Sequence, residues 1–390
     1  METAVIIEGA RTPIGRFVGS FADTPAVELG TLAVQEAMRR ADVAPEQIDQ
    51  TILGHARQAG NGPNTGRQVS VRAGVPIEVA AYNVNMACGS GMQAVQLAAQ
   101  QIALGDAEVV LAGGMENMSR VPYLLPEMRR GHRLGDTQIV DAMYRDGLLD
   151  PLCGLVMGET AENLVDRYDI TREEQDEFAL GSQQKASAGA SRRAKELFPI
   201  ETALNGRPVT VTEDEHPRAD TTLAGLAKLT PVFREGGSVT AGNSSGITDG
   251  AAAMVVMSAT RAKAEGREPL ARIVASSWAG VPPELMGIGP VPATAKVLDK
   301  TGLTIADLDL IEMNEAFAAQ VIACERELKF DRDRLNPNGG GISLGHPIGM
   351  SGARIILALA YELRAAGKSL GLATLCISGG QGLAVVLERS

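Results

Sequence analysis

Three pairs of landmarks in the 390-residue sequence recur at nearly the same separation. In each pair the same local signal appears twice: a segment that leads from a helix-like stretch into a strand, a Ser-Gly helix start, or a glycine helix end. The pairs are the segments 42–52 and 302–312, the helix starts at Ser90 and Ser351, and the helix ends at Gly105 and Gly367. Their separations are 260, 261 and 262 residues. This recurrence indicates two copies of one fold, which we expect to span residues 1–118 and 245–390.

Short apolar runs in both halves predict strands that are covered on both faces. Residues 109–112, 252–257 and 385–387 are continuous apolar runs, as is typical of strands that lie between layers of helices. The expected fold class is therefore α/β, with strands and helices alternating around a layered core.

The segment 119–244 between the halves has a different texture. Its first part carries Pro122, Pro126, Gly131 and Gly135, and residues 213–219 are polar. We expect an inserted loop domain with some helices, one of which begins at the capping box Thr171-Arg172-Glu173-Glu174. Such an insertion is one of two things: variable surface decoration, or a lid that also forms an oligomer contact. The second interpretation is based on the observation that long irregular segments in compact domains often bind ligands.

Composition limits the partners that the chain can have. The formal net charge is −11 and no basic run is present, so neither nucleic acid nor an anionic membrane surface is an expected partner. Neither a membrane-spanning apolar stretch nor a signal peptide is evident, which favours the cytoplasm. The four cysteines and four histidines lack metal-ligand spacing, and we expect free thiols, no metal and no bound cofactor.

Cys88 stands at the junction between a strand-like segment and a helix-like one. Gly89 and Gly91 follow it and allow close approach of backbone to a ligand, while the helix directs its positive end at the sulfur. A helix N-terminus lowers a cysteine pKa, so we expect Cys88 to form a thiolate readily. Cys153 and Cys324 lack these signals and are expected to be inert packing residues.

Three further polar groups are predicted to lie at element ends on the same side of the sheets as Cys88. His346 precedes the helix start that corresponds to the one beside Cys88, Asn314 follows a strand, and Cys376 enters the turn that contains Ser378. Active sites of α/β proteins form at such strand and helix ends, so a cysteine-histidine pair is expected there. The other histidines, His55, His132 and His216, have no partner pattern and are expected to be structural or exposed.

These motifs closely resemble those of the thiolase family, which includes the acetyl-CoA acetyltransferases and the 3-ketoacyl-CoA thiolases. The resemblance extends from the segment 10–13 to the C-terminus, and it implies two duplicated halves in a five-layer α-β-α-β-α core. It also implies that Cys88 is the acylated nucleophile and that His346 activates it. Cys376 would exchange the proton of the second substrate's α-carbon or of the leaving CoA thiol, and Asn314 would support an oxyanion site through a water. Backbone amides of Cys88 and Ser378 would form a second oxyanion site.

The resemblance further implies a ping-pong Claisen condensation of two acetyl-CoA molecules to acetoacetyl-CoA and CoA, and the reverse thiolysis. The inserted domain would bind CoA, and the stretch 129–136 looks like a tetramerisation loop, so a homotetramer built as a dimer of dimers is expected. The residues implied in CoA or acyl contacts are Arg218, Ser245, Ala316, Phe317, Met157 and Met286.

Three positions depart from the pattern of the family. Short-chain members commonly have His-Met-Gly where this chain has Val156-Met157-Gly158, and Gly225 replaces a serine that lines the CoA site. Ser378 stands where glycine is usual, so its amide can serve only if serine accepts the required backbone angles. Acyl chain length therefore stays open.

Four other functions are compatible with parts of the sequence. A 3-ketoacyl-CoA thiolase for longer chains would use the same catalytic groups. A β-ketoacyl synthase would also acylate a cysteine, but Cys376 in the terminal turn argues against it. Gly89, Gly91 and Ala94 match a weak dinucleotide fingerprint with Glu116 as the acidic partner, which leaves Cys88 unexplained. A non-catalytic acyl-CoA or lipid carrier would not need the aligned Cys88, His346 and Cys376.

Overall fold

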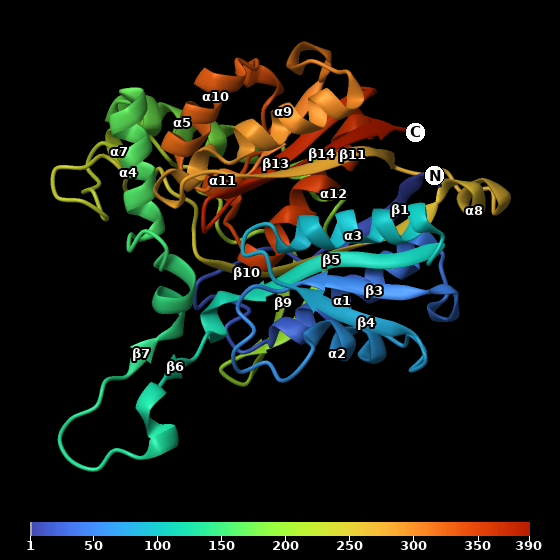
Figure 1. Ribbon diagram of the computed structural model, residues 1–390, viewed down its shortest axis with the longest axis horizontal. Coiled ribbons are helices and arrows are strands. Elements are labelled where there is room, and N and C mark those ends of the chain that lie inside the picture. Colours follow the sequence, from blue (N-terminus) through green and yellow to red (C-terminus); the bar gives the residue numbers. More distant parts are fainter. Residues whose placement is uncertain (1) are drawn as a thin grey trace.

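The computed structural model describes residues 2–390 and contains one large mixed sheet of ten strands (Figure 1). Its order is β12-β13-β14-β11-β1-β10-β5-β3-β4, with β2 paired to β10. The strands of this sheet are β1 (Ala4–Arg11), β2 (Gly15–Arg16), β3 (Gln50–Gly54), β4 (Ala80–Val84), β5 (Val109–Asn117), β10 (Thr248–Ser258), β11 (Ala271–Gly280), β12 (Leu310–Met313), β13 (Leu370–Ile377) and β14 (Gln381–Arg389). Strands β1 and β11 pair only at Val5 with Arg272 and Ile6 with Ala271. The large sheet therefore consists of two smaller sheets joined at this edge. The first contains β1, β2, β3, β4, β5 and β10, and the second contains β11, β12, β13 and β14.

Helices cover both sheets and fill the space between them, which gives the five layers that the family resemblance implies (Figure 1). Helices α3 and α12 lie in the central layer, α1 and α2 cover the first sheet, and α9 and α10 cover the second. The longer helices are α1 (Ala26–Ala41), α2 (Thr65–Arg72), α3 (Ser90–Leu104), α4 (Met157–Tyr168), α5 (Arg172–Ala188), α9 (Pro290–Thr301), α10 (Ala318–Leu328) and α12 (Ile348–Ala366). The shorter ones are α6 (Ala190–Arg193), α7 (Leu223–Leu226), α8 (Ala259–Ala264) and α11 (Gly341–Leu344).

Matching hydrogen bonds confirm the duplication. Asp49 Oδ2 accepts the backbone N–H groups of Glu108 and Val109 at 2.8 and 2.9 Å. In the second half Asp309 Oδ2 accepts those of Ser369 and Leu370 at 2.9 and 3.0 Å. In each half the carboxylate thus fastens the start of one parallel strand to the loop that precedes its neighbour.

The two central helices meet at corresponding glycines. A Cβ on Gly91 would lie 2.7 Å from Ala353 N, and one on Gly352 would lie 2.4 Å from Met92 N. Only glycine permits this close approach of the two backbones. The first turns of α3 and α12 are consequently held side by side at the centre of the molecule.

Two boundaries differ from the sequence prediction. Helix α12 begins at Ile348, three residues before the predicted start at Ser351, because Pro347 caps the helix and accepts the N–H of Met350. Strand β10 was expected in the second half, residues 245–390, but it pairs with β1 and β5 in the first sheet. The continuous apolar run of β10 is buried on both faces. Such a pattern fits a strand of either sheet, so the sequence alone does not assign it to one of them.

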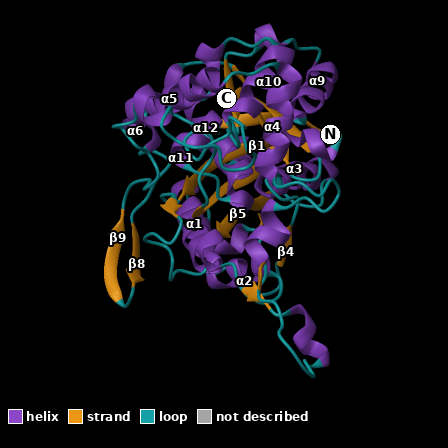
Figure 2. Ribbon diagram, turned by 90° about the vertical axis from the view of Figure 1, so that its left-hand side faces the viewer, coloured by secondary structure: helices purple, strands orange, loops and turns teal. Residues whose placement is uncertain are grey.

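The segment between the halves contains two projections. One carries the short strands β6 (Tyr123–Leu124) and β7 (Val140–Asp141) and extends from the body at the lower left of Figure 1. The other is the hairpin of β8 (Ile200–Leu204) and β9 (Arg207–Val211), which stands away from the body in Figure 2. Helices α4 and α5 instead share a hydrophobic cluster with α10. Single helical turns occur at Pro45–Gln47, Met118–Arg120, Pro126–Arg130, Tyr144–Leu148, Pro283–Ile288, Ile305–Asp307 and Arg332–Arg334.

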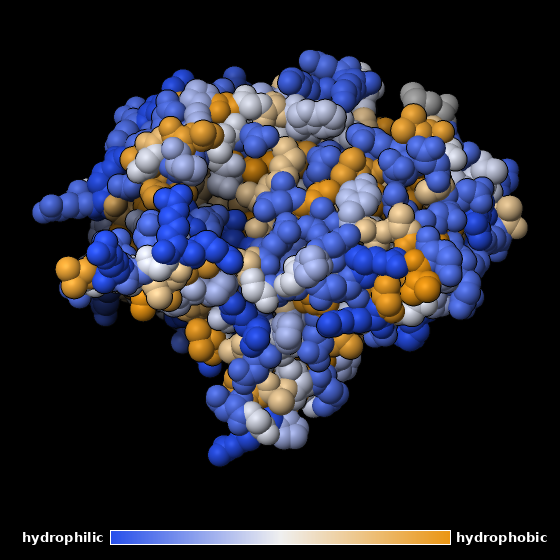
Figure 3. Space-filling model, turned by 60° about the horizontal axis from the view of Figure 1, so that its bottom comes forward, coloured by the Kyte–Doolittle hydropathy of each residue, from blue (hydrophilic) through white to orange (hydrophobic). Residues whose placement is uncertain are grey.

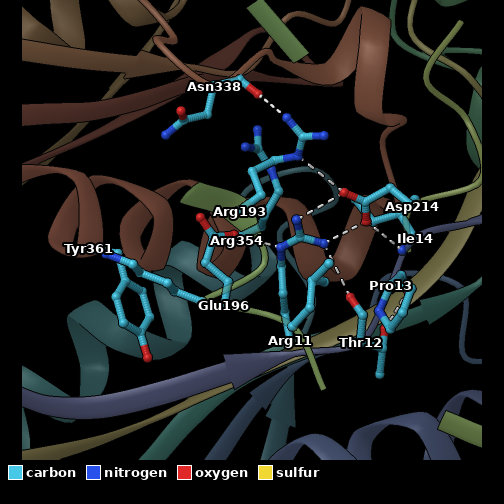
Figure 4. A network of polar contacts seen from close by, with 12 residues as sticks. Arg11, Thr12, Pro13, Ile14, Arg193, Glu196, Asp214, Asn338, Arg354 and Tyr361 are labelled. Atoms are coloured by element: carbon cyan, nitrogen blue, oxygen red, sulfur yellow. Dashed lines mark hydrogen bonds and ion pairs between the residues drawn. The ribbon is translucent and has the colours of Figure 1, made fainter. Parts of the chain in front are cut away.

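A buried ionic network fastens the inserted segment to both halves (Figure 4). Arg11 on β1 contacts Glu196 at 2.6 Å and Asp214 at 2.7 Å, and its side chain has no exposed surface. Arg193 contacts the same aspartate at 3.4 Å and donates to the carbonyl oxygen of Asn338 at 2.8 Å. The two guanidinium groups of this network therefore each have a carboxylate partner, which offsets the cost of burying their charge.

Polar and charged side chains cover most of the face seen in Figure 3, with small apolar patches between them. Among residues 2–390, none of the helices combines the length and the apolar character needed to cross a membrane. The same part of the chain holds no cluster of three His, Cys, Asp or Glu side chains arranged to bind a metal ion.

Candidate active site

Cys88 lies in a tight loop between β4 and α3. The preceding Ala87 has φ of +44°, a strained conformation for a residue with a side chain. Ser90 stabilises the loop, because its Oγ accepts the N–H of Met86 at 2.9 Å and donates to the carbonyl oxygen of Ala87 at 2.7 Å. A Cβ on Gly89 would lie 2.5 Å from Leu383 Cδ1, so the loop packs closely on β14 at this residue.

The thiol of Cys88 is only partly exposed, and its environment differs from the prediction. Burial raises its pKa, whereas the charge of Arg57 and the backbone N–H groups of Ser378 and of Cys88 itself oppose that rise. The sequence predicts a lowered pKa from the helix N-terminus. The direction is reversed because loss of hydration disfavours the thiolate more than the amides and the arginine favour it.

Cys376 lies at the end of β13, beside Cys88. It is 1% exposed, and its pKa is well above the ordinary value because of burial and because of the nearby negative charge that Cys88 carries when ionised. The following turn places positive φ angles at Gly379 (+87°) and Gly380 (+78°) and not at Ser378. Serine at position 378 is therefore compatible with the turn, and its amide is directed at the Cys88 sulfur.

His346 is held in a single tautomer by Ser351. The Ser351 hydroxyl donates to the carbonyl oxygen of Pro347 at 2.9 Å, so its oxygen accepts from His346 Nδ1, which lies 2.5 Å away. Nδ1 must then carry the proton, which leaves Nε2 as a free base. Burial lowers the pKa of His346 to about 3, and the charges of Arg354 and Arg57 contribute in the same direction. The ring is therefore neutral at physiological pH.

Asn314 follows β12 and faces His346. Its backbone N–H donates to the carbonyl oxygen of Thr374 at 3.1 Å, which links it to the strand that carries Cys376. Its Nδ2 lies 3.4 Å from His346 Nε2, and its buried Oδ1 has no hydrogen-bond partner among the described residues. Asn314 Nδ2 is thus within hydrogen-bond distance of the unprotonated Nε2 and can donate to it.

The Ser351→Ala variant tests how His346 is oriented. If His346 is the base that the sequence predicts, we expect turnover to fall about tenfold, the effect of about 1.4 kcal/mol from one lost hydrogen bond. Steady-state rates measure the effect. Ser187→Ala is the matched control, because Ser187 also donates to the carbonyl oxygen four residues earlier but lies in α5. Equal rates in the two variants would contradict the role of Ser351.

Comparison with known proteins decides the family. The model of the thiolase N-terminal domain matches residues 4–260, and that of the thiolase C-terminal domain matches residues 267–389. The chain belongs to the thiolase family. The first match ends just after β10, in agreement with the position of that strand in the first sheet.

Individual relatives of this thiolase match over its full length. The acetyl-CoA acetyltransferases of Escherichia coli (strain K12) and Pseudomonas aeruginosa are each 50% identical to it, with 100% of both chains covered. The crystal structure of the Bacillus anthracis acetyl-CoA acetyltransferase has a TM-score of 0.98 and 48% identity, covering 100% of this chain and 99% of that one. Human mitochondrial 3-ketoacyl-CoA thiolase has a TM-score of 0.97 and 41% identity, with the same coverage.

Most of the residues predicted to contact substrate in this thiolase lie together. Met157, Met286, Ala316 and Phe317 belong to one apolar cluster with Cys376, and Phe233 packs edge-on against Phe317 with ring centroids 6.0 Å apart. Ser245 is joined to this cluster, because its N–H donates to the carbonyl oxygen of Ala316 at 2.9 Å. Arg218 is exposed in the inserted segment, where its N–H donates to Gln183 Oε1 at 2.8 Å.

Glu116, the acidic residue that a dinucleotide site would require, is fully buried, and its carboxylate is already hydrogen-bonded within the protein. Its carboxylate accepts the backbone N–H groups of Ala56, Arg57 and Gly349 and lies 3.2 Å from His55 Nε2. No oxygen of this carboxylate is presented to a ribose. The dinucleotide interpretation is thus unsupported in this thiolase, and Glu116 instead joins the first turn of α12 to the loop after β3.

Sequence reasoning missed three residues at the site. Ser351 was recognised only as a helix start, although a serine five residues after His346 is within reach of its ring. Asn85, whose Nδ2 donates to the carbonyl oxygen of Ala56 at 3.0 Å, and Arg57 lie in segments without a recognisable motif. Their proximity to Cys88 depends on the pairing of β3 with β4, which residue patterns do not specify.

Proposed function

We propose that this thiolase condenses two acetyl-CoA molecules to acetoacetyl-CoA and CoA, and catalyses the reverse thiolysis, through an acyl-Cys88 intermediate. The observation that supports this most strongly is the arrangement of two thiols, one neutral imidazole and backbone amides around Cys88. The 50% identity to acetyl-CoA acetyltransferases supports acetyl-CoA as the substrate.

The first half-reaction transfers the acyl group to the enzyme. His346 Nε2 takes the proton of Cys88, and the thiolate attacks the thioester carbonyl carbon. Backbone N–H groups of Cys88 and Ser378, or Asn314 and His346 together with a water, stabilise the oxyanion of the tetrahedral intermediate. The carbon-sulfur bond to CoA then breaks, and the leaving CoA thiolate takes the proton of Cys376. The half-reaction leaves acyl-Cys88, an imidazolium and a Cys376 thiolate.

The second half-reaction forms the carbon-carbon bond. The Cys376 thiolate removes an α-proton from the second acetyl-CoA, and the resulting enolate attacks the carbonyl carbon of acyl-Cys88. Collapse of the intermediate releases acetoacetyl-CoA and the Cys88 thiolate, which recovers its proton from His346. The raised pKa of Cys376 suits this step, because a strong base is needed for a weakly acidic C–H bond.

A substrate panel tests the function and its acyl range. Thiolysis rates are measured with 3-ketoacyl-CoA substrates of increasing chain length, and we expect kcat/KM to be highest for acetoacetyl-CoA. A maximum at longer chains would instead establish a 3-ketoacyl-CoA thiolase of β-oxidation. The similarity to human mitochondrial 3-ketoacyl-CoA thiolase is the reason for including these substrates. Binding of acyl-CoA without turnover of any substrate would indicate a carrier.

We propose that CoA enters only as part of the substrates and products, and that the cycle uses no metal ion or other cofactor. Every proton and acyl transfer in the two half-reactions is assigned to Cys88, His346, Cys376 or CoA itself. The proposed location of this reaction is the cytoplasm.

We further propose a homotetramer that assembles through the projection between β6 and β7. Exposed apolar side chains on and beside this projection support this, among them Tyr123 (67%), Leu134 (91%) and Ile139 (68%), because burying such side chains against a partner subunit is favourable. Deletion of residues 129–135 should convert a tetramer into a dimer in light scattering, and Leu134→Asp should weaken the tetramer. A wild-type dimer would contradict the proposal.

A further inference from the structure

Arg57 is a buried cation without a carboxylate partner. Arg57 is 9% exposed, and its side chain forms no salt bridge with any of residues 2–390. The guanidinium Nη2 donates to the carbonyl oxygen of Gly147 at 2.9 Å, while the buried Nε has no partner. Arg11 and Arg193, by contrast, are buried against Asp214. A buried unpaired charge is strongly unfavourable, so a group that becomes negative close to Arg57 would relieve it.

The backbone of Arg57 is fixed beside the nucleophile. The carbonyl oxygen of Ala56 accepts Asn85 Nδ2 at 3.0 Å, which joins this segment to the loop that carries Cys88. Ala56 and Cys88 also pack in one apolar cluster. The N–H of Arg57 donates to Glu116 Oε1 at 3.1 Å, so this carboxylate is bound by backbone and does not pair with the guanidinium.

We propose that Arg57 is the counter-charge of the Cys88 thiolate, a positioning residue held in place by the carbonyl oxygen of Gly147. This inference rests on the proposed role of Cys88 as nucleophile. The negative charge that Arg57 lacks in the resting site then forms during catalysis, each time Cys88 loses its proton. Attraction between the two charges is strong in such a poorly hydrated site.

The charges around Cys88 agree with this assignment. Arg57 lowers the pKa of Cys88 against the effect of burial, and it also lowers the pKa of His346. Glu116 on β5 acts on Cys88 in the opposite direction, and Cys376 on β13 and His346 are the other ionisable groups at the site. Asp146, in the turn that carries Gly147, forms no salt bridge with Arg57, although the charge of Arg57 lowers the pKa of that carboxyl. Among these groups Arg57 is the cation, so its removal leaves burial and Glu116 unopposed except by backbone amides.

Substitution of Gly147 is a second way to disturb the contact between the Arg57 guanidinium and the Gly147 carbonyl oxygen. Gly147 lies in the π-helical turn Tyr144–Leu148 at the base of the projecting segment. A Cβ on this residue would lie 2.7 Å from Arg57 Nε and 3.0 Å from Nη2. Gly147→Ala should therefore displace the guanidinium while the charge of Arg57 stays in the protein.

The test is the pH dependence of alkylation of Cys88 by iodoacetamide in the full-length protein, followed by mass spectrometry of the peptide that contains residue 88. Arg57→Met should move the alkylation profile to higher pH and slow alkylation at pH 7 by about tenfold, because only the thiolate reacts. Arg57→Lys keeps the charge and should restore most of the rate. Gly147→Ala should shift the profile in the same direction as Arg57→Met.

Arg39→Met is the control for loss of a cation, since Arg39 lies in α1, is exposed and is paired with Glu36. Its profile should equal that of the wild type. Folded Arg57→Met and Gly147→Ala proteins with wild-type profiles would overturn the proposal, and if Arg57→Met fails to fold, Gly147→Ala against Arg57→Lys decides it. Failure of the proposed function has a different signature: no acyl group on Cys88 of the wild type, whatever the alkylation profile.

Discussion

The Cys88→Ala variant should lose both condensation and thiolysis by about 10⁴-fold or more, because loss of a covalent nucleophile removes the whole acyl-enzyme route. The variant should still fold, since Cys88 as a residue is only partly buried and the loop is held by Ser90 and Asn85. Steady-state rates in both directions, together with a thermal melt, measure these effects.

A second cysteine provides the control for this experiment. Cys324 is fully buried in α10, and its thiol contacts the carbonyl oxygen of Gly287 at 3.3 Å. It contributes to the raised pKa of Cys376, but the proposed cycle assigns no step to it. Cys324→Ala should lower stability and leave the turnover number within about twofold of the wild type, as expected for a packing residue. Substantial thiolysis by Cys88→Ala would exclude Cys88 as the acyl carrier.

The Cys376→Ser variant should keep acylation but lose about 10²- to 10⁴-fold in condensation, the range that a positioned general base contributes. Serine preserves the size of the side chain, yet its hydroxyl is far less acidic than a thiol and yields no base for the α-proton. Rapid mixing with acetyl-CoA should then show a burst of CoA that matches the enzyme concentration, followed by slow turnover.

The size of the burst separates two roles for Cys376. If CoA can leave as a thiolate without the proton of Cys376, the burst keeps its full amplitude although the steady-state rate falls. Condensation at the wild-type rate would show that another group removes the α-proton. Loss of the burst itself would show that proton donation by Cys376 to the leaving CoA is indispensable for acylation, and would contradict the predicted retention of acylation.

The sequence was sufficient to predict the duplication and most of the elements around the site. Helix ends at Gly105 and Gly367 and the capping box of Thr171 with Glu174 are local signals, and each occurs where expected. Local signals suffice there because a left-handed glycine or a capping side chain determines the backbone without help from distant residues.

Features that depend on the third dimension were not predictable in this way. The apolar run of β10 fits a buried strand of either sheet, and only its pairing with β1 and β5 assigns it to the first. The raised pKa of Cys88 follows from burial beneath surrounding segments, and Arg57 reaches the site through the packing of a loop without a motif. The pairing of β10, the pKa of Cys88 and the position of Arg57 each depend on contacts between segments far apart in the sequence. The spacing of residues along the chain does not reveal those contacts.

The central claim is that Cys88 carries the acyl group, and direct detection of the acyl-enzyme tests it most simply. The wild-type protein is mixed with acetyl-CoA, quenched in acid, digested and examined by mass spectrometry. We predict one added acetyl group on the peptide that contains Cys88, and its disappearance when free CoA is added before the quench. An acetyl group on Cys376 instead, or turnover without any acetylated peptide, would contradict the account.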